Sequence, residues 1–413
     1  MYLIGEEELE AVAKVIRSGK VFRYGVGNQC DIFERRYVEY LGVRHAKLSA
    51  SGTNALTAAV IALELGPGDE VLVPAHTFMA TALAVLAAGA IPVIVNIDET
   101  LTIDPESVDT AVGPHTKAVI PVHMWGASCN MDALMRIARK HNLRVIEDAC
   151  QAVGGGYEGR MLGAIGDMGA FSFNYYKNMT AGEGGAVVTN DPDLHYRASC
   201  VIDPTKFYWT SRAEDKKPFA SNGARASEIM GAILNVQLDR LPGMIEAMRA
   251  EKRRILSGTL HLADLGLKPS PMNSPDYDCA AQVMYLLPTA KAAIQFNEIF
   301  PSVIAGKTGR HNYVEWDQIL ERAGAGHPLM NPFNMDANKQ CRRNYSKDML
   351  PRSLDILNRT VMVATDPRHT SGQIDQMISN IDVAAKATFG QIALKEAEIK
   401  NTLTVDDQKF NLS

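Results

Sequence analysis

The sequence predicts an α/β fold: a large domain with a mostly parallel sheet of seven strands flanked by helices, followed by a smaller α+β domain. Three observations support this prediction. Short β-rich runs alternate with helix-like segments between residues 45 and 150, which is typical of a doubly wound sheet. After residue 150, two more β-rich runs follow without a helix between them. The length, 413 residues, also exceeds what one hydrophobic core usually organises.

The β-rich runs of the first half form the parallel part of the predicted sheet. They are residues 45–51, 70–75, 91–97, 117–123 and 144–150. The runs "GAFSF" and "GAVVTN" supply the sixth and seventh strands. A long helical section follows over about residues 226–262, and we expect Pro242 and Gly243 to bend it.

These elements suggest three parts of the chain. Residues 1–240 form the large domain, and residues 241–386 form the small C-terminal domain, which mixes strand, loop and a final amphipathic helix. Residues 387–413 are polar and weakly patterned. We expect them to form a tail, and this composition is typical of disordered termini.

Composition excludes several classes of protein. The net charge is -5, the pI is about 6.1 and the basic residues are scattered, so neither nucleic acid nor an anionic membrane is an expected partner. Gly89 and Pro92 divide the longest apolar stretch into pieces too short to span a bilayer. The six cysteines include no CxxC pair, which fits a reduced cytoplasmic protein better than a disulfide framework or a metal site.

Ligands of doubly wound sheets bind at the carboxyl ends of the strands. In "SASGTNAL", Ser51, Gly52 and Thr53 follow a strand and open a helix. Free backbone N–H groups and the helix dipole favour an anion there, most simply a phosphate. The alternative is an ordinary glycine turn with a Ser or Thr helix cap.

Two further strand ends carry candidate residues. Phe78 opens a helix, so its ring could cover a flat cofactor or could simply belong to the core. Asp148 ends an apolar strand, where a carboxylate is costly to bury without a partner. It could hold a protonated ring nitrogen or form an ion pair with a helix, and Gln151 could reach an adjacent ring substituent.

The stretch "FSFNYYKNMTAGEGG" places Lys177 between Ser172 and a glycine-rich run. A lysine in a loop is by default solvated. This one accompanies an anion cradle, a stacking aromatic and a buried acid, and the four together are what pyridoxal 5'-phosphate requires. The pattern predicts this cofactor, with Lys177 forming an imine with its aldehyde and Ser172 adding a phosphate contact.

The chain resembles the DegT/DnrJ/EryC1/StrS family, fold-type I pyridoxal phosphate aminotransferases of sugar and aminocyclitol biosynthesis. The motifs that carry the resemblance lie in order over about residues 1–240: "SGTNAL", "PAHTFMATA", "PVHMWG", "EDACQAVGG" and "GDMGAFSFNYYKNMTAGEGGAVVTND". The resemblance implies catalytic roles for Lys177 and Asp148, the latter as partner of the pyridine nitrogen. It also implies that Gln151 contacts the 3-hydroxyl and Phe78 stacks, and it adds phosphate contacts from Gly52, Thr53 and Ser172.

One family signature, N-x-R-x-S-E, supplies an asparagine that reaches the partner's cofactor across a dimer interface. Here the sequence reads "SNGARASE", so Asn222 stands one residue early while Arg225 and Glu228 stay in register. The resemblance implies a homodimer with shared active sites, and Asn222 is the candidate for the cross-subunit contact.

The function expected from the resemblance is transfer of an amino group from glutamate or glutamine to a keto or aldehyde sugar, most often a nucleotide-linked one. Alternatives are an aminotransferase for a cyclitol ketone or higher sugar acid, a non-catalytic regulator, and a sugar dehydratase, although family dehydratases commonly have histidine in place of the lysine. An NAD dehydrogenase is a weaker alternative, since no GxGxxG follows the first strand. Candidate substrate contacts are His123, Lys307, Arg310, His311 and Trp316. A core histidine and a solvated loop are the simpler alternatives for these residues.

Overall fold

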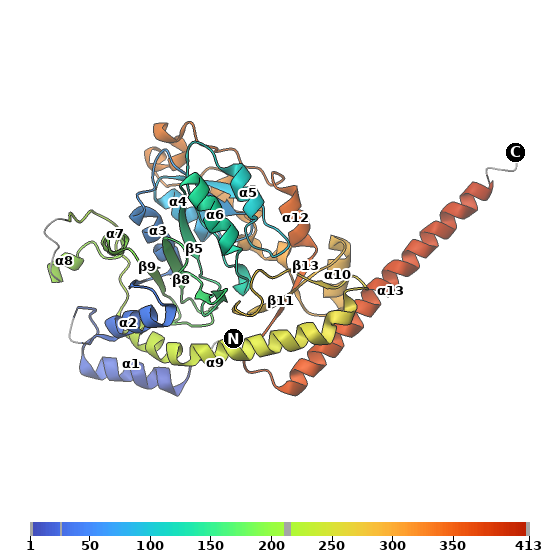
Figure 1. Ribbon diagram of the computed structural model, residues 1–413, viewed down its shortest axis with the longest axis horizontal. Coiled ribbons are helices and arrows are strands. Elements are labelled where there is room, and N and C mark those ends of the chain that lie inside the picture. The colour runs from blue at the N-terminus through green and yellow to red at the C-terminus, as the bar shows by residue number, and fades with distance from the viewer. Residues whose placement is uncertain (1–2, 25–26, 210–215, 410–413) are drawn as a thin grey trace.

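The computed structural model describes residues 3–24, 27–209 and 216–409, with side chains described up to residue 390. A seven-stranded sheet forms the centre of the large domain (Figure 1). Its strand order is β1-β9-β8-β5-β4-β2-β3. The strands are β1 (His45–Ser49), β2 (Glu70–Pro74), β3 (Ile91–Val95), β4 (Thr116–Val119), β5 (Arg144–Asp148), β8 (Met168–Ser172) and β9 (Gly185–Thr189).

The prediction of a mostly parallel sheet of seven strands is confirmed. Only β9 runs antiparallel to its neighbours, β1 and β8, whereas the other pairs in the sheet are parallel. The connection between β8 and β9 contains no helix, as expected, and it carries Lys177. The two final strands therefore bring this loop to the edge where the parallel strands end.

Hydrophobic cores lie on both faces of the sheet. Alternate residues of one strand point to opposite faces, and Val71 and Leu72 accordingly enter different cores. One core is covered by α2 (Gln29–Leu41), α6 (Met131–His141) and α9 (Glu228–Thr259). The other is covered by α3 (Gly52–Ala62), α4 (Ala80–Ala87) and α7 (Pro192–Ile202).

Helix α9 connects the two domains. It is a continuous helix of 32 residues that contains Pro242. The helix is therefore not broken at Pro242 and Gly243, where we expected it to bend. In Figure 1, α9 runs beneath the large domain, next to α1 (Glu6–Ser18) and α2, and continues toward the small domain. Its first turn is capped by Ser227, whose side chain accepts the Met230 N–H.

The small domain is built on a second, antiparallel sheet with the order β10-β11-β13-β12. Helices α10 (Ala290–Ile299) and α13 (Ser371–Lys409) pack with it. The strands are β10 (Lys268–Pro269), β11 (Gln282–Leu286), β12 (Val303–Ile304) and β13 (Thr360–Ala364). Helix α13 includes most of the segment that we expected to be a tail, and residues 410–413 of that segment lie outside the described residues.

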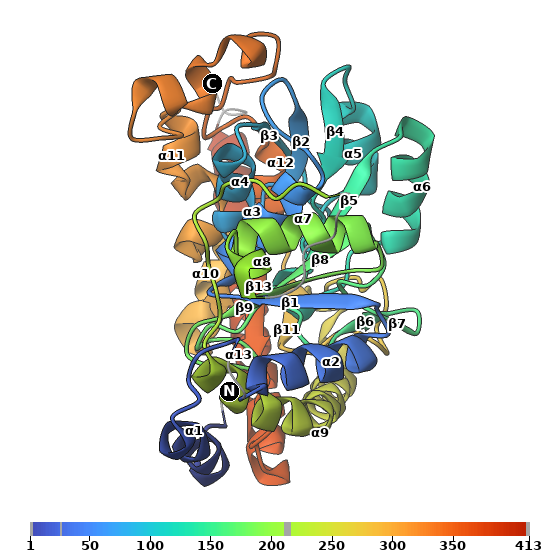
Figure 2. The same ribbon diagram turned by 90° about the vertical axis from the view of Figure 1, so that its left-hand side faces the viewer.

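The segment between β12 and β13 departs from a simple two-domain division. Tyr313, Trp316 and Phe333 belong to the hydrophobic core beneath α3 and α4, together with residues of β2 and β3. Figure 2 shows this segment, coloured orange, at the end of the large domain that contains β2 and β3. Part of the predicted small domain therefore packs on the large one, and it reaches the predicted ligand-binding edge.

Candidate active site

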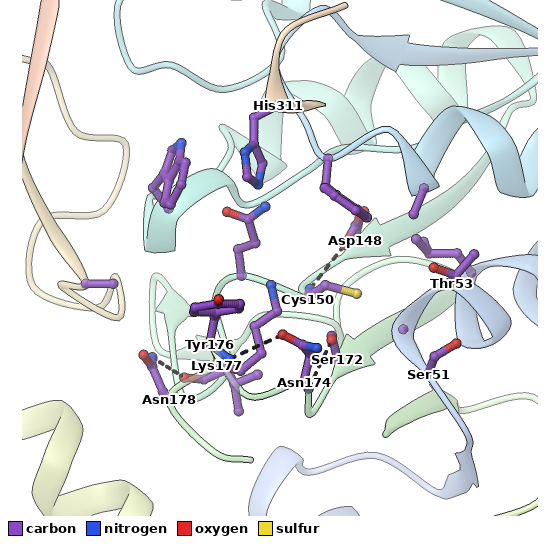
Figure 3. A pocket seen from close by; sticks show the side chains of 18 of the residues that line it. Ser51, Thr53, Asp148, Cys150, Ser172, Asn174, Tyr176, Lys177, Asn178 and His311 are labelled. Atoms are coloured by element: carbon purple, nitrogen blue, oxygen red, sulfur yellow. Dashed lines mark hydrogen bonds between the residues drawn. The ribbon is translucent and has the colours of Figure 1, made fainter. Parts of the chain in front are cut away.

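A pocket of about 820 Å³ lies at the carboxyl ends of the strands (Figure 3). Of the predicted cofactor residues, those that line it are Ser51, Gly52, Thr53, Phe78, Asp148, Gln151, Ser172 and Lys177. Arg310 and His311, predicted to contact substrate, also line it. Residues spread over 260 positions of the sequence therefore meet in one cavity, from Ser51 to His311.

The predicted anion cradle lies where α3 begins. Ser51 caps this helix by accepting the Asn54 N–H at 3.2 Å, and the N–H groups of the first turn have no acceptor within a helix. Gly52 lies against Ser172, since a Cβ atom at Gly52 would come within 2.7 Å of the Ser172 Cβ. The tight approach requires glycine and brings the Ser172 hydroxyl beside the helix N-terminus, so these residues fit a phosphate.

Asp148 ends β5 with its carboxylate buried; the residue is 4% exposed. One oxygen accepts the Thr81 hydroxyl at 2.7 Å, and the other accepts the Cys150 N–H at 3.1 Å. Among the described residues, no lysine, arginine or histidine forms an ion pair with it. A buried carboxylate that is held in place but lacks a cation fits a protonated pyridine nitrogen, which would supply the missing charge.

Lys177 follows a tight turn that begins at Asn174. Its N–H donates to the Asn174 carbonyl at 2.9 Å. The Asn174 side chain accepts the Tyr176 N–H at 3.2 Å and donates to Glu183 at 3.0 Å. In Figure 3 the lysine side chain extends from this turn toward Cys150 and Asp148. The turn therefore fixes the backbone of a lysine whose amine is in the pocket.

Aromatic rings form another wall. The rings of Phe78 and His311 lie with centroids 5.5 Å apart, and those of Trp125 and His311 lie 4.8 Å apart. Burial lowers the pKa of His311, and its Nδ1 atom lies 3.1 Å from the Thr308 carbonyl. Phe78 is 39% exposed although it is apolar, so its ring is available to a flat ligand.

Four predicted site residues do not line this pocket. His123 is fully buried, with Nε2 3.1 Å from Glu147, and its Nδ1 accepts the Cys129 N–H, so it is a core histidine held by polar partners. Trp316 is also fully buried, and its indole N–H donates to the Arg310 carbonyl at 2.9 Å. Lys307 is exposed outside the cavity, as is Asn222.

Other residues of the site were not predicted from the sequence. Thr81 lies one turn after Phe78 and is fully buried against Asp148. Trp125, two residues after His123, lines the pocket instead of that histidine. The turn formed by Asn174 could have been found, since an asparagine three residues before the lysine is typical of a side chain that organises a turn.

The fold and the site together define the class of fold-type I pyridoxal phosphate enzymes. A solved aminotransferase from Psychrobacter cryohalolentis superposes with a TM-score of 0.78 at 28% identity, covering 95% of this chain and 98% of that one. The chain belongs to the DegT/DnrJ/EryC1/StrS aminotransferase family, whose model matches residues 3–382. The resemblance predicted from the motifs is therefore confirmed.

Two curated relatives add detail. GDP-perosamine synthase of Caulobacter vibrioides is 40% identical over 239 residues, which are 57% of this chain and 62% of that protein. A UDP-N-acetyl-3-dehydro-alpha-D-glucosamine 3-aminotransferase of Acidithiobacillus ferrooxidans is 45% identical over 248 residues, 59% of this chain and 64% of that protein. In both cases the similarity spans less than two thirds of the relative's own length.

No helix in the described part of the chain combines the length and the apolar composition that crossing a bilayer would require.

Proposed function

We propose that this protein transfers an amino group from glutamate or glutamine to a keto or aldehyde carbon of a sugar, and that the sugar is nucleotide-linked. The observation that carries the proposal is the convergence of Lys177, the buried Asp148 and the cradle of Gly52 and Ser172 in one pocket. The names of the relatives, which refer to GDP-linked and UDP-linked sugars, support the choice of substrate class.

When bound, pyridoxal phosphate supplies an aldehyde that condenses with amines and a ring that withdraws electrons from the bonds next to the nitrogen. Asp148 pairs with the ring nitrogen and keeps its proton in place. Lys177 would hold the cofactor covalently, and its amine would move a proton at C4'. Phe78 covers the ring face, and Gln151 contacts the 3-hydroxyl.

The phosphate is held by the first turn of α3, the Ser51 and Thr53 hydroxyls and Ser172. Arg310 is the substrate-side candidate for an anionic group, because its exposed side chain lines the pocket and forms no ion pair with other described residues. A donor carboxylate and a sugar-linked phosphate would both suit a guanidinium.

We further propose a cytoplasmic homodimer in which Asn222 of one subunit completes the site of the other. Asn222 is exposed and outside the pocket of its own chain, as a residue offered to a partner would be. The six cysteines are free thiols, which supports a reducing compartment. Light scattering at micromolar concentration tests the assembly, and a fully active monomer would contradict it.

The function is tested on the enzyme as isolated. We expect visible absorbance from the bound cofactor, and reduction with borohydride followed by peptide mapping should find the cofactor on Lys177. Lys177→Ala should abolish turnover. A label on any other lysine would exclude the assignment.

The direction of transfer is tested by half-reactions. Glutamate or glutamine alone should shift the absorbance to that of the aminated cofactor, and a keto sugar should restore the original band. If both donors leave the spectrum unchanged while a sugar substrate loses water, the protein is a dehydratase instead.

A further inference from the structure

Trp125 adopts a backbone conformation that a bulky residue rarely takes. Its φ is 54° and its ψ is 26°, in the left-handed region, and the following Gly126 also has a positive φ of 88°. Side chains disfavour this region, and such residues persist where the surrounding structure enforces them, frequently at functional sites. In this conformation the Trp125 residue lines the active-site pocket.

A buried histidine fixes the direction of the indole. The Trp125 Nε1–H donates to Nε2 of His76 at 3.2 Å, and Nδ1 of His76 lies 3.2 Å from the Leu101 carbonyl. A carbonyl can only accept, so Nδ1 carries the ring proton and Nε2 offers its lone pair to the indole. His76 is fully buried, and burial lowers its pKa to about 3, which keeps the ring neutral.

The backbone that carries the ring beside Trp125, that of His311, is held by hydrogen bonds from other parts of the chain. The Thr77 N–H donates to the His311 carbonyl at 3.0 Å, and the Arg310 carbonyl accepts the Met79 N–H at 3.1 Å. The same Arg310 carbonyl accepts the indole N–H of the core residue Trp316 at 2.9 Å. His311 therefore belongs to a segment hydrogen-bonded to the loop after β2, and its ring forms a wall of the pocket with that of Trp125.

We propose that Trp125 and His311 form the surface on which the hexose ring of the nucleotide-linked sugar packs, and that His76 is a positioning residue that orients Trp125. This inference rests on the proposed function. A hexose presents apolar C–H faces that pack well on aromatic rings, and ligand pockets are lined mainly by apolar and aromatic side chains. Phe78 covers the cofactor ring in the proposed site, so the wall beyond His311 is available to the second substrate.

The test is calorimetric titration of the holoenzyme with UDP-N-acetylglucosamine, GDP-mannose and dTDP-glucose. Trp125→Asn removes the ring but suits a left-handed backbone, since asparagine tolerates that region. We expect its Kd for the sugar that binds wild type best to rise at least tenfold. Trp125→Phe keeps a ring but cannot donate to His76, so its Kd should rise about fivefold, less than that of Trp125→Asn.

His76 is tested with a matched pair of variants. His76→Leu removes the acceptor of the indole N–H and should raise the same Kd about fivefold, whereas His76→Gln can still accept and should come closer to wild type. Both variants should retain the cofactor and undergo the spectral shift with glutamate at the wild-type rate. A role in folding alone would instead change cofactor retention and the glutamate reaction together with sugar binding.

Two results would overturn the inference: wild-type holoenzyme that binds none of the three nucleotide sugars, or Trp125→Asn enzyme that binds them as wild type does. Neither result bears on amino transfer from glutamate. A wild type that shows no spectral change with either donor amino acid would instead count against the proposed function, whatever its affinity for sugars.

Discussion

At the scale of single residues, the site depends on groups that hold Asp148 as much as on Asp148 itself. The carboxylate is buried at the end of β5 and accepts hydrogen bonds from the Thr81 hydroxyl and the Cys150 N–H. These bonds hold both carboxylate oxygens in place. In the proposed function this carboxylate pairs with the cationic ring nitrogen, and Thr81 holds its orientation.

Substitution of the two residues should separate charge from orientation. Asp148→Asn keeps the shape but loses the charge, so we expect turnover to fall by about 10²-fold or more. Thr81→Val removes the hydrogen bond to Asp148, which is worth about 1 kcal/mol, and should lower turnover about fivefold. Thr81→Ser retains the hydroxyl and is the control. The measurement is steady-state turnover of cofactor-saturated enzyme; Thr81→Val activity equal to that of wild type would contradict the role of Thr81.

Residues whose local sequence context is unusual for a strand end could be predicted as site residues. Asp148 is an acid in an apolar run, and Gly52 lies between a strand and a helix, so local pattern was sufficient for both. Thr81 acts through a contact with a residue 67 positions away. A hydroxyl in an apolar helix carries no local sign of such a partner.

At the scale of elements, α9 stabilises the large domain by lying very close to α2. Glu228, in the first turn of α9, is fully buried and accepts the N–H groups of Gln29 and Cys30 at the start of α2. At Gly231, one turn later, a Cβ atom would come within 2.5 Å of the Cys30 nitrogen. The two helices therefore touch backbone to backbone at their first turns.

Two glycines of α9 offer a matched test of this contact. Gly231→Ala forces the helices apart and should destabilise the fold by about 1–3 kcal/mol. Gly243→Ala faces open space, because no atom lies within 4 Å of the place that its Cβ atom would occupy, and it should stabilise by about 0.5–1 kcal/mol because alanine favours a helix. Urea denaturation measures both. Equal stability of the two variants would exclude the close packing of α2 on α9.

Regular helices and strands could be predicted because the spacing of their apolar residues follows the face that is buried. The runs at 70–75 and 91–97 became β2 (Glu70–Pro74) and β3 (Ile91–Val95) within two residues. The short 3-10 turns between β12 and β13 have no such period. Their positions depend on long-range contacts, for example of Trp316 with the second core, which local pattern does not contain.

At the scale of the whole molecule, the segment between β12 and β13 is fastened to the far edge of the large sheet by polar contacts as well as by its apolar side chains. Asn338 accepts the Gly68 N–H at 2.6 Å and donates to the Gly89 carbonyl at 2.9 Å. Arg342 forms an ion pair with Glu70 at the start of β2. Since the same segment carries His311, these contacts connect the shape of the pocket to the stability of the molecule.

The Glu70–Arg342 pair should contribute measurably to that stability. Glu70 is 2% exposed and also accepts the Arg342 backbone N–H at 2.6 Å, so Arg342→Met would leave a buried carboxylate without its cation. We expect a loss of about 2 kcal/mol, less than for a fully buried pair because the Arg342 side chain is 45% exposed. Lys339→Ala is the control. It breaks an exposed pair with Asp336 and should change stability by less than about 0.5 kcal/mol.

The destabilisation caused by Arg342→Met should be present at neutral pH and should disappear on acidification. Burial raises the pKa of Glu70, but the hydrogen bonds and charge of Arg342 outweigh burial and hold it below the ordinary 4.5. The folded state therefore binds the proton less readily than the unfolded state, so the pair stabilises fully above pH 4.5 and its contribution is lost as pH falls through the lower folded value. Urea midpoints of wild type and Arg342→Met should differ at pH 7 and converge on acidification. A difference that is the same at pH 7 and below pH 4 would mean that Arg342 stabilises the molecule by packing rather than through its charge.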